Sequence, residues 1–121
     1  MTPERRGKFR LQSKDLTFVA VRPEFVNLGR LLDISKDGLC FQYMSKEGQV
    51  IDGATFNIDI FINRNGYYLS RVPCRLIYDR EINEGTTFPI GLEYRRCGLQ
   101  FQRLTKEQAD GLALYLKIHT V

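Results

Sequence analysis

Residues 26–43 have the sequence VNLGRLLDISKDGLCFQY, in which the turn-forming segment Ser35-Lys36-Asp37-Gly38 separates two apolar runs. Aliphatic and aromatic residues recur at a spacing of two on both sides of the turn, as they do in strands with one buried face. An Asp-Gly pair between two apolar runs is a strong local signal for a hairpin. The segment therefore predicts two antiparallel strands that are neighbours in a sheet.

Similar alternation recurs along the rest of the chain. It predicts further strands within residues 17–22, 56–62, 69–79 and 88–101. Asn65-Gly66 is a second hairpin signal, and Gly91 and Gly98 mark positions where a sheet is expected to bend. We therefore expect an antiparallel arrangement of five or more short strands.

The alternation also assigns side chains to faces. In residues 56–62, Asn57, Asp59 and Phe61 are expected on the face opposite the isoleucines. In residues 69–79, one face is expected to hold Val72, Cys74, Leu76 and Tyr78. Pro73 has no amide hydrogen to donate, so it predicts an edge strand or a bulge.

One amphipathic helix is predicted at the C-terminal end of the sequence. Thr105 to Gln108 fit a capping box, and Ala109, Leu112, Ala113 and Leu116 follow at helical spacing to form an apolar stripe. Short strands followed by one helix, without alternation of strands and helices, imply an antiparallel barrel or sandwich with the helix packed against it.

Composition limits the class of protein. The chain has 121 residues, of which 43% are hydrophobic and 26% charged, as expected for one globular domain. No apolar run approaches the roughly 18 residues of a membrane span, and no apolar run follows the basic start as in a secretory signal, so a cytoplasmic location is expected. Cys40, Cys74 and Cys97 are odd in number and lack C-x-x-C spacing, which favours buried free thiols over disulfides or a zinc site.

Positive charge is concentrated at the start of the chain. The net charge is +4, and five basic residues lie in the first fourteen positions: Arg5, Arg6, Lys8, Arg10 and Lys14. We expect residues 1–15 to form a flexible arm and residues 16–121 to form the globular domain. Such an arm is either a solvated tail or a segment that contacts an anion.

Two short motifs have chemistry that suits a guanine nucleotide. Arg6 and Arg10 are four residues apart, and a guanidinium group can pair with phosphate oxygens or with the O6 and N7 acceptors of guanine. Asp33 and Ser35 are two residues apart at a strand end, so both are expected to point to the same side, where a carboxylate can accept the donors of the other guanine edge. Gly38 permits a positive φ and close backbone approach. Taken alone, the second motif is more typical of an ordinary hairpin turn closed by a side chain than of a ligand site.

Together these motifs make the sequence resemble the PilZ domain family, whose signature is Arg-x-x-x-Arg followed by Asp/Asn-x-Ser-x-x-Gly. Arg6 and Arg10 match the first motif, and Asp33, Ser35 and Gly38 match the second. Residues 97–101, CGLQF, resemble the closing strand of the family. The resemblance covers nearly the whole chain and implies an all-β fold, a six-stranded antiparallel barrel with a C-terminal helix.

The resemblance also implies a function. It predicts a bacterial, cytoplasmic, non-catalytic receptor for the second messenger cyclic di-GMP that acts in signal transduction through an unidentified protein partner. The ligand contacts would come from Arg6, Arg10, Asp33 and Ser35, with Gly38 in the turn. Arg5 stands where some members have an extra arginine, which is associated with two stacked ligand molecules. No cofactor, metal, membrane or polymeric nucleic acid is expected.

Two other classes of function agree less well with the sequence. An enzyme is disfavoured because the single histidine, His119, lies near the end of the chain without an evident nucleophile, as in a frayed helix terminus. The alternative function is a small barrel that binds single-stranded nucleic acid, with Tyr67, Tyr68 and Tyr94 as stacking platforms. A protein-interaction module without ligand would be expected if the arginine motif were missing.

Overall fold

The computed structural model describes residues 11–12, 15–22, 28–46, 54–62, 66–82 and 91–120. These residues form seven strands and one helix: β1 (Leu11–Gln12), β2 (Phe18–Val21), β3 (Leu28–Ile34), β4 (Gly38–Lys46), β5 (Thr55–Phe61), β6 (Tyr68–Ile82), β7 (Leu92–Phe101) and α1 (Lys106–Ile118). All strand pairs are antiparallel. The predicted hairpin at residues 35–38 is confirmed, since β3 pairs with β4. β5 pairs with β6 as the second hairpin signal predicted, while Asn65 of that signal lies outside the described residues.

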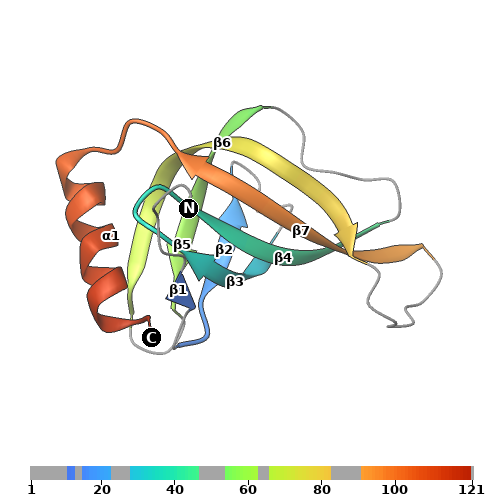
Figure 1. The fold of residues 1–121 in the computed structure, drawn as a ribbon, viewed down its shortest axis with the longest axis horizontal. Helices are drawn as coiled ribbons and strands as arrows, with labels where there is room; N and C mark the ends of the chain where they lie inside the picture. Colours follow the sequence, from blue (N-terminus) through green and yellow to red (C-terminus); the bar gives the residue numbers. More distant parts are fainter. Residues whose placement is uncertain are drawn as a thin grey trace, which may run out of the picture.

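The sheet closes into a barrel (Figure 1). Six strands pair in the order β3-β2-β5-β6-β7-β4, and β4 pairs again with β3, which confirms the six-stranded barrel. Strand β1 pairs with the C-terminal end of β3, along the same edge whose N-terminal part pairs with β2. Leu11 and Gln12 therefore form a strand within the span predicted as an arm, while residues 1–10 lie outside the described residues.

Side chains that alternate toward the barrel interior form the core. They include Val19, Leu31, Ile34, Leu39, Phe41, Ile58, Ile60, Val72, Cys97 and Leu99. Cys40, Cys74 and Cys97 are buried free cysteines, as predicted. Burial raises the pKa of the Cys74 and Cys97 thiols, because an apolar interior disfavours the charged thiolate.

Helix α1 packs beside one end of the barrel (Figure 1). The predicted capping box is confirmed: the Thr105 hydroxyl accepts from the Gln108 amide, and the Gln108 side chain accepts from the Thr105 amide, both at 3.0 Å. The predicted stripe is partly wrong, because Ala109 and Ala113 are exposed and the buried face holds Leu112 and Tyr115. The buried residues Leu112, Tyr115 and His119 follow one another at spacings of three and four, so the stripe that faces the barrel is rotated away from the alanines.

A bulge lies in β6 where this strand pairs with β5. The pairing shifts between Ile58 and Ile60 because β6 has one extra residue there, while β5 pairs regularly with β2. Asp59 therefore keeps its predicted place on the face opposite Ile58 and Ile60, but it is only 1% exposed because neighbouring side chains cover it. β6 pairs with β5 and β7, so the edge position suggested by Pro73 is wrong. The irregularity lies just before Pro73, where Arg71 has a φ of +54°.

Asp59 stabilises this bulge and, through it, the position of α1. Its carboxylate accepts from the Tyr68 hydroxyl at 2.6 Å and from the Arg71 amide at 2.8 Å, and lies 3.7 Å from the Arg22 guanidinium. The carbonyl of Arg71 in turn accepts from the Gln108 side chain of α1 at 2.9 Å. A buried carboxylate therefore fixes the backbone to which the helix is bound.

Replacing Asp59 with Ala should lower the free energy of unfolding by about 3 kcal/mol, because the Arg71 amide and the Arg22 guanidinium lose a charged partner. Tyr68→Phe is the matched control: it removes one hydrogen bond of the same cluster and should cost about 1 kcal/mol or less. Urea unfolding followed by circular dichroism measures both. A smaller loss for Asp59→Ala than for Tyr68→Phe would contradict the assigned role of the carboxylate.

Candidate functional site

The second motif lies at the hairpin between β3 and β4. Asp33 is the second-last residue of strand β3 and pairs with Cys40. Ser35 lies in the turn, and Gly38 begins β4. Arg5, Arg6 and Arg10, the predicted ligand contacts of the first motif, lie outside the described residues.

The Ser35 hydroxyl closes the turn. It accepts from the Asp37 amide at 3.2 Å and donates to the Gly38 carbonyl at 3.4 Å, while the Ser35 amide donates to the same carbonyl at 2.8 Å. This is the side-chain-closed turn that was one interpretation of the motif. A hydroxyl can accept two hydrogen bonds, and its 3.4 Å donor contact is long, so the group retains capacity to bind a ligand.

Gly38 is required for a steric reason. A Cβ atom at this position would lie 2.2 Å from the Leu99 carbonyl oxygen of β7, a distance that no side chain tolerates. The predicted close backbone approach is therefore present, but the predicted positive φ is wrong, since the described glycines with positive φ are Gly66 and Gly91. Gly38 brings the turn against β7.

Strand β1 brings the segment that follows the arginine motif to this hairpin. Leu11 lies opposite Ile34, and Gln12 lies opposite Asp33. β1 thus begins its pairing beside Ile34, the residue that precedes Ser35.

Tyr78 belongs to the same surface, and the sequence placed it on the wrong face. The pairing of β6 with β7 shifts between Leu76 and Tyr78, which moves Tyr78 from the interior to the outer face. Asp33, Cys40, Gly98 and Tyr78 are then successive cross-strand partners on β3, β4, β7 and β6. The sequence predicted a bend at Gly98; β7 pairs regularly with β4 there, and the irregularity lies opposite it in β6.

The Tyr78 ring lies over Gly98 and is 36% exposed. A Cβ atom at Gly98 would lie 2.4 Å from the ring, so only glycine leaves room for it. The Tyr78 hydroxyl is 3.2 Å from the Cys40 sulfur, and the Arg80 guanidinium lies 5.2 Å from the ring centroid. An aromatic ring that covers a glycine of the neighbouring strand is a known way to stabilise a sheet. Gly98 is therefore the sequence signal that could have indicated an aromatic residue on the outer face opposite it.

Arginines border this surface. Arg30, Gln42, Arg96 and Arg80 form the next outward row across β3, β4, β7 and β6. Three positive charges in one row, beside a single carboxylate at Asp33, give this face a positive potential. The surface formed by the Asp33 and Arg80 rows is therefore suited to an anion with a planar group.

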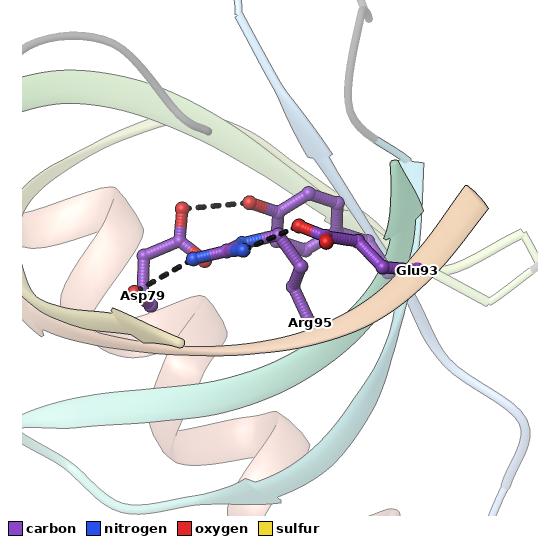
Figure 2. A network of polar contacts seen from close by, with 4 residues as sticks. Asp79, Glu93 and Arg95 are labelled. Carbon is purple, nitrogen blue, oxygen red and sulfur yellow. Dashed lines mark hydrogen bonds and ion pairs between the residues drawn. The ribbon is translucent and has the colours of Figure 1, made fainter. Parts of the chain in front are cut away.

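A second polar cluster lies on the inner side of β6 and β7. Figure 2 shows Asp79, Glu93 and Arg95 directed toward one another. The Arg95 guanidinium donates to Asp79 at 2.9 Å and to Glu93 at 2.5 Å, and the Tyr43 hydroxyl donates to Asp79 at 2.7 Å. Burial by itself lowers the pKa of Arg95, but the hydrogen bonds to Asp79 and Glu93 outweigh it and raise the pKa. These groups are bound to one another, so the cluster is a structural one.

His119 and the tyrosines do not form the sites considered from the sequence. His119 is buried rather than frayed, and its Nδ1 atom lies 2.6 Å from the Asp15 carboxylate. Tyr67 packs under α1 and donates to the Gly111 carbonyl, whereas Tyr68 binds Asp59 and Tyr94 lies on the outer face of β7. The three tyrosines therefore do not share a stacking platform.

The described ranges contain neither a metal site nor a membrane-spanning helix. No group of three His, Cys, Asp or Glu side chains there is arranged to hold a metal ion. No helix among these residues has the length and apolar character needed to cross a bilayer.

Comparison with known proteins relates the chain to one fold. A scan against protein-family models finds no match, and a search of curated proteins also finds none. Among solved structures, the chain is similar to the PilZ domain with c-di-GMP of YcgR from Escherichia coli, with a TM-score of 0.61 and 17% sequence identity over 94% of this chain and 92% of that one. The chain therefore has the fold of a PilZ domain, as the sequence resemblance implied.

The ionisation of Tyr78 tests the outer surface. Burial, and next the hydrogen bond with Cys40, raise the pKa of Tyr78 from 10.0 to about 12. Because the folded pKa lies above the unfolded value, this tyrosine stabilises the fold fully below pH 10 and loses that contribution as the pH rises toward 12. The difference in absorbance at roughly 295 nm between the parent protein and Tyr78→Phe should therefore titrate near pH 12, and a midpoint near pH 10 would place the ring in solvent.

Proposed function

We propose that this chain is a non-catalytic receptor for cyclic di-GMP that binds the ligand through Arg6, Arg10, Asp33 and Ser35. The observation that supports this most directly is the pairing of β1 with β3. One peptide bond joins Arg10 to Leu11, and Leu11 lies opposite Ile34 next to Ser35. Five peptide bonds join Arg6 to Leu11 and span at most about 18 Å when fully extended, so covalent reach alone keeps both arginines within that distance of Leu11.

The charge of the outer surface supports an anionic ligand. A cyclic dinucleotide has two phosphates, and Arg30, Arg80 and Arg96 supply positive charge beside the Asp33 row. In the proposed complex, Arg6 and Arg10 hold guanine edges and phosphates, while Asp33 accepts from the N1 and N2 donors of guanine.

Stacking supports a purine ligand. The Tyr78 ring covers Gly98, and the Arg80 guanidinium lies over the Tyr78 ring. A guanidinium plane also stacks well on a purine. The PilZ domain of YcgR, which has the same fold, is described with c-di-GMP, which also supports this ligand. Arg5 would add a third guanidinium that offsets the charge of a second ligand molecule, so two molecules per domain are proposed.

The receptor is proposed to act as a ligand-switched adaptor in bacterial cytoplasmic signalling, with an unidentified protein as its downstream partner. Its only proposed chemistry is binding. The His119 ring is bound to Asp15, and the carboxylates of Asp79 and Glu93 are bound to Arg95, so these groups serve the fold.

Arg10→Ala should weaken cyclic di-GMP binding by about ten- to a hundredfold, because a charge-assisted hydrogen bond contributes about 1.5–3 kcal/mol. Lys106→Ala is the matched control: it also removes one positive charge, but from an 89% exposed side chain on α1. Calorimetric titration measures the dissociation constant and the number of ligand molecules per domain. Equal affinity of Arg10→Ala and Lys106→Ala would remove Arg10 from the site.

A salt series separates this function from the alternative of single-stranded nucleic acid binding. Binding of a polymer falls steeply with salt through counterion release, whereas a dinucleotide with two phosphates should lose affinity by less than about tenfold between 50 and 200 mM salt. Cyclic di-GMP and a single-stranded oligonucleotide are titrated across the same series. Tighter binding of the oligonucleotide at every salt concentration would favour the alternative.

A further inference from the structure

Residues 11–17 connect the proposed nucleotide site to helix α1. Leu11 and Gln12 pair with the end of β3 at Ile34 and Asp33. The segment returns to β3 at Thr17, whose carbonyl accepts from the Leu31 amide at 2.9 Å. Between these two contacts with β3, the chain reaches across to the helix.

Two side chains of this segment bind successive turns of α1. The Thr17 hydroxyl lies 2.6 Å from the Tyr115 hydroxyl, and both residues are 1% exposed. Thr17 donates its single hydroxyl hydrogen to the Asp15 carbonyl at 2.9 Å, so Tyr115 is the donor to Thr17. The Asp15 carboxylate lies 2.6 Å from Nδ1 of His119, one turn further along the helix.

These contacts are costly to break separately. A buried hydroxyl donor that loses its acceptor retains its desolvation penalty, so displacement of residues 15–17 from the docked helix deprives the Tyr115 hydroxyl of its acceptor. The Tyr115 ring also packs against Tyr67 and His119, with ring centroids 5.3 Å apart in both cases. Docking of the helix therefore favours the position of residues 15–17. Because only two residues separate Gln12 from Asp15 in the sequence, it also favours the pairing of β1 with β3.

We infer that ligand binding at the β3 hairpin and docking of α1 on the barrel are thermodynamically linked through residues 11–17, an inference that rests on the proposed function. A ligand held jointly by Arg10 and Asp33 favours the pairing of β1, and the paired β1 favours the docked helix. Because linkage is reciprocal, the ligand strengthens the contacts of residues 15–17 with the helix by the same factor by which these contacts strengthen ligand binding, so loss of these contacts lowers affinity for the ligand. Helix α1 is thus the element that responds to occupancy of the site.

The test uses two conservative substitutions on opposite sides of one hydrogen bond. Thr17→Val and Tyr115→Phe preserve shape and ring packing and should each weaken cyclic di-GMP binding by about fivefold, the lower end of the range for coupled sites. The double variant should bind no more weakly than either single variant, since all three lack the same bond. In the parent protein, ligand should increase amide-exchange protection of residues 112–119, and this increase should shrink in the variants.

Gln108→Ala is the control on the same helix. It removes the hydrogen bonds to the Ser70 and Arg71 carbonyls at the opposite end of α1 and keeps the contacts of Tyr115 and His119 with residues 15–17 through which the linkage is inferred to act. Its ligand affinity should stay within about twofold of the parent. The linkage is overturned if Gln108→Ala loses as much affinity as Thr17→Val, or if Thr17→Val and Tyr115→Phe both bind as tightly as the parent. Either result leaves the proposed function intact. Failure of the parent to bind cyclic di-GMP overturns both.

Discussion

Strand β3 is hydrogen-bonded along both of its edges, and the rest of the structure depends on this double pairing. On one edge it pairs with β4, which closes the barrel; on the other it pairs with β2 and then with β1. The first pairing is local, through a four-residue turn. The second brings the chain that follows the arginine motif back to the turn itself. Closure of the barrel and assembly of the proposed site therefore come from the same strand.

Bulges determine which side chains face the ligand surface. In a regular strand Tyr78 would point into the core with Asp79 outside. The bulge between Leu76 and Tyr78 exchanges the faces of Tyr78 and Asp79, and the bulge opposite Asp59 presents the Arg71 amide to its carboxylate. Tyr78 then covers Gly98 on the outer face, and Asp79 meets Arg95 inside. One single-residue shift thus produces both the aromatic surface and the interior ion cluster.

The interior charges are compatible with stability because each is hydrogen-bonded. Burial of an isolated carboxylate or guanidinium costs several kcal/mol, and removal of one partner of a buried pair is strongly destabilising. Asp79, Glu93 and Arg95 offset these costs mutually, with Tyr43 as an additional donor. Burial, and next the hydrogen bond to Asp79, raise the pKa of Tyr43, so its hydroxyl remains a donor. This cluster fixes the inner side of the strands whose outer side holds Tyr78 and Arg80.

The sequence by itself determined the strands, the two hairpins, the capped helix and the three buried cysteines, because these depend on local periodicity, turn chemistry and capping within a few residues. It also located Asp33, Ser35 and Gly38, whose turn is local. Only the tertiary structure decided the positions of Tyr78, Asp59, Tyr115 and His119. Their surroundings depend on bulges or on partners far along the chain, such as Thr17 for Tyr115, and a period-two or helical pattern contains no information about contacts between distant segments.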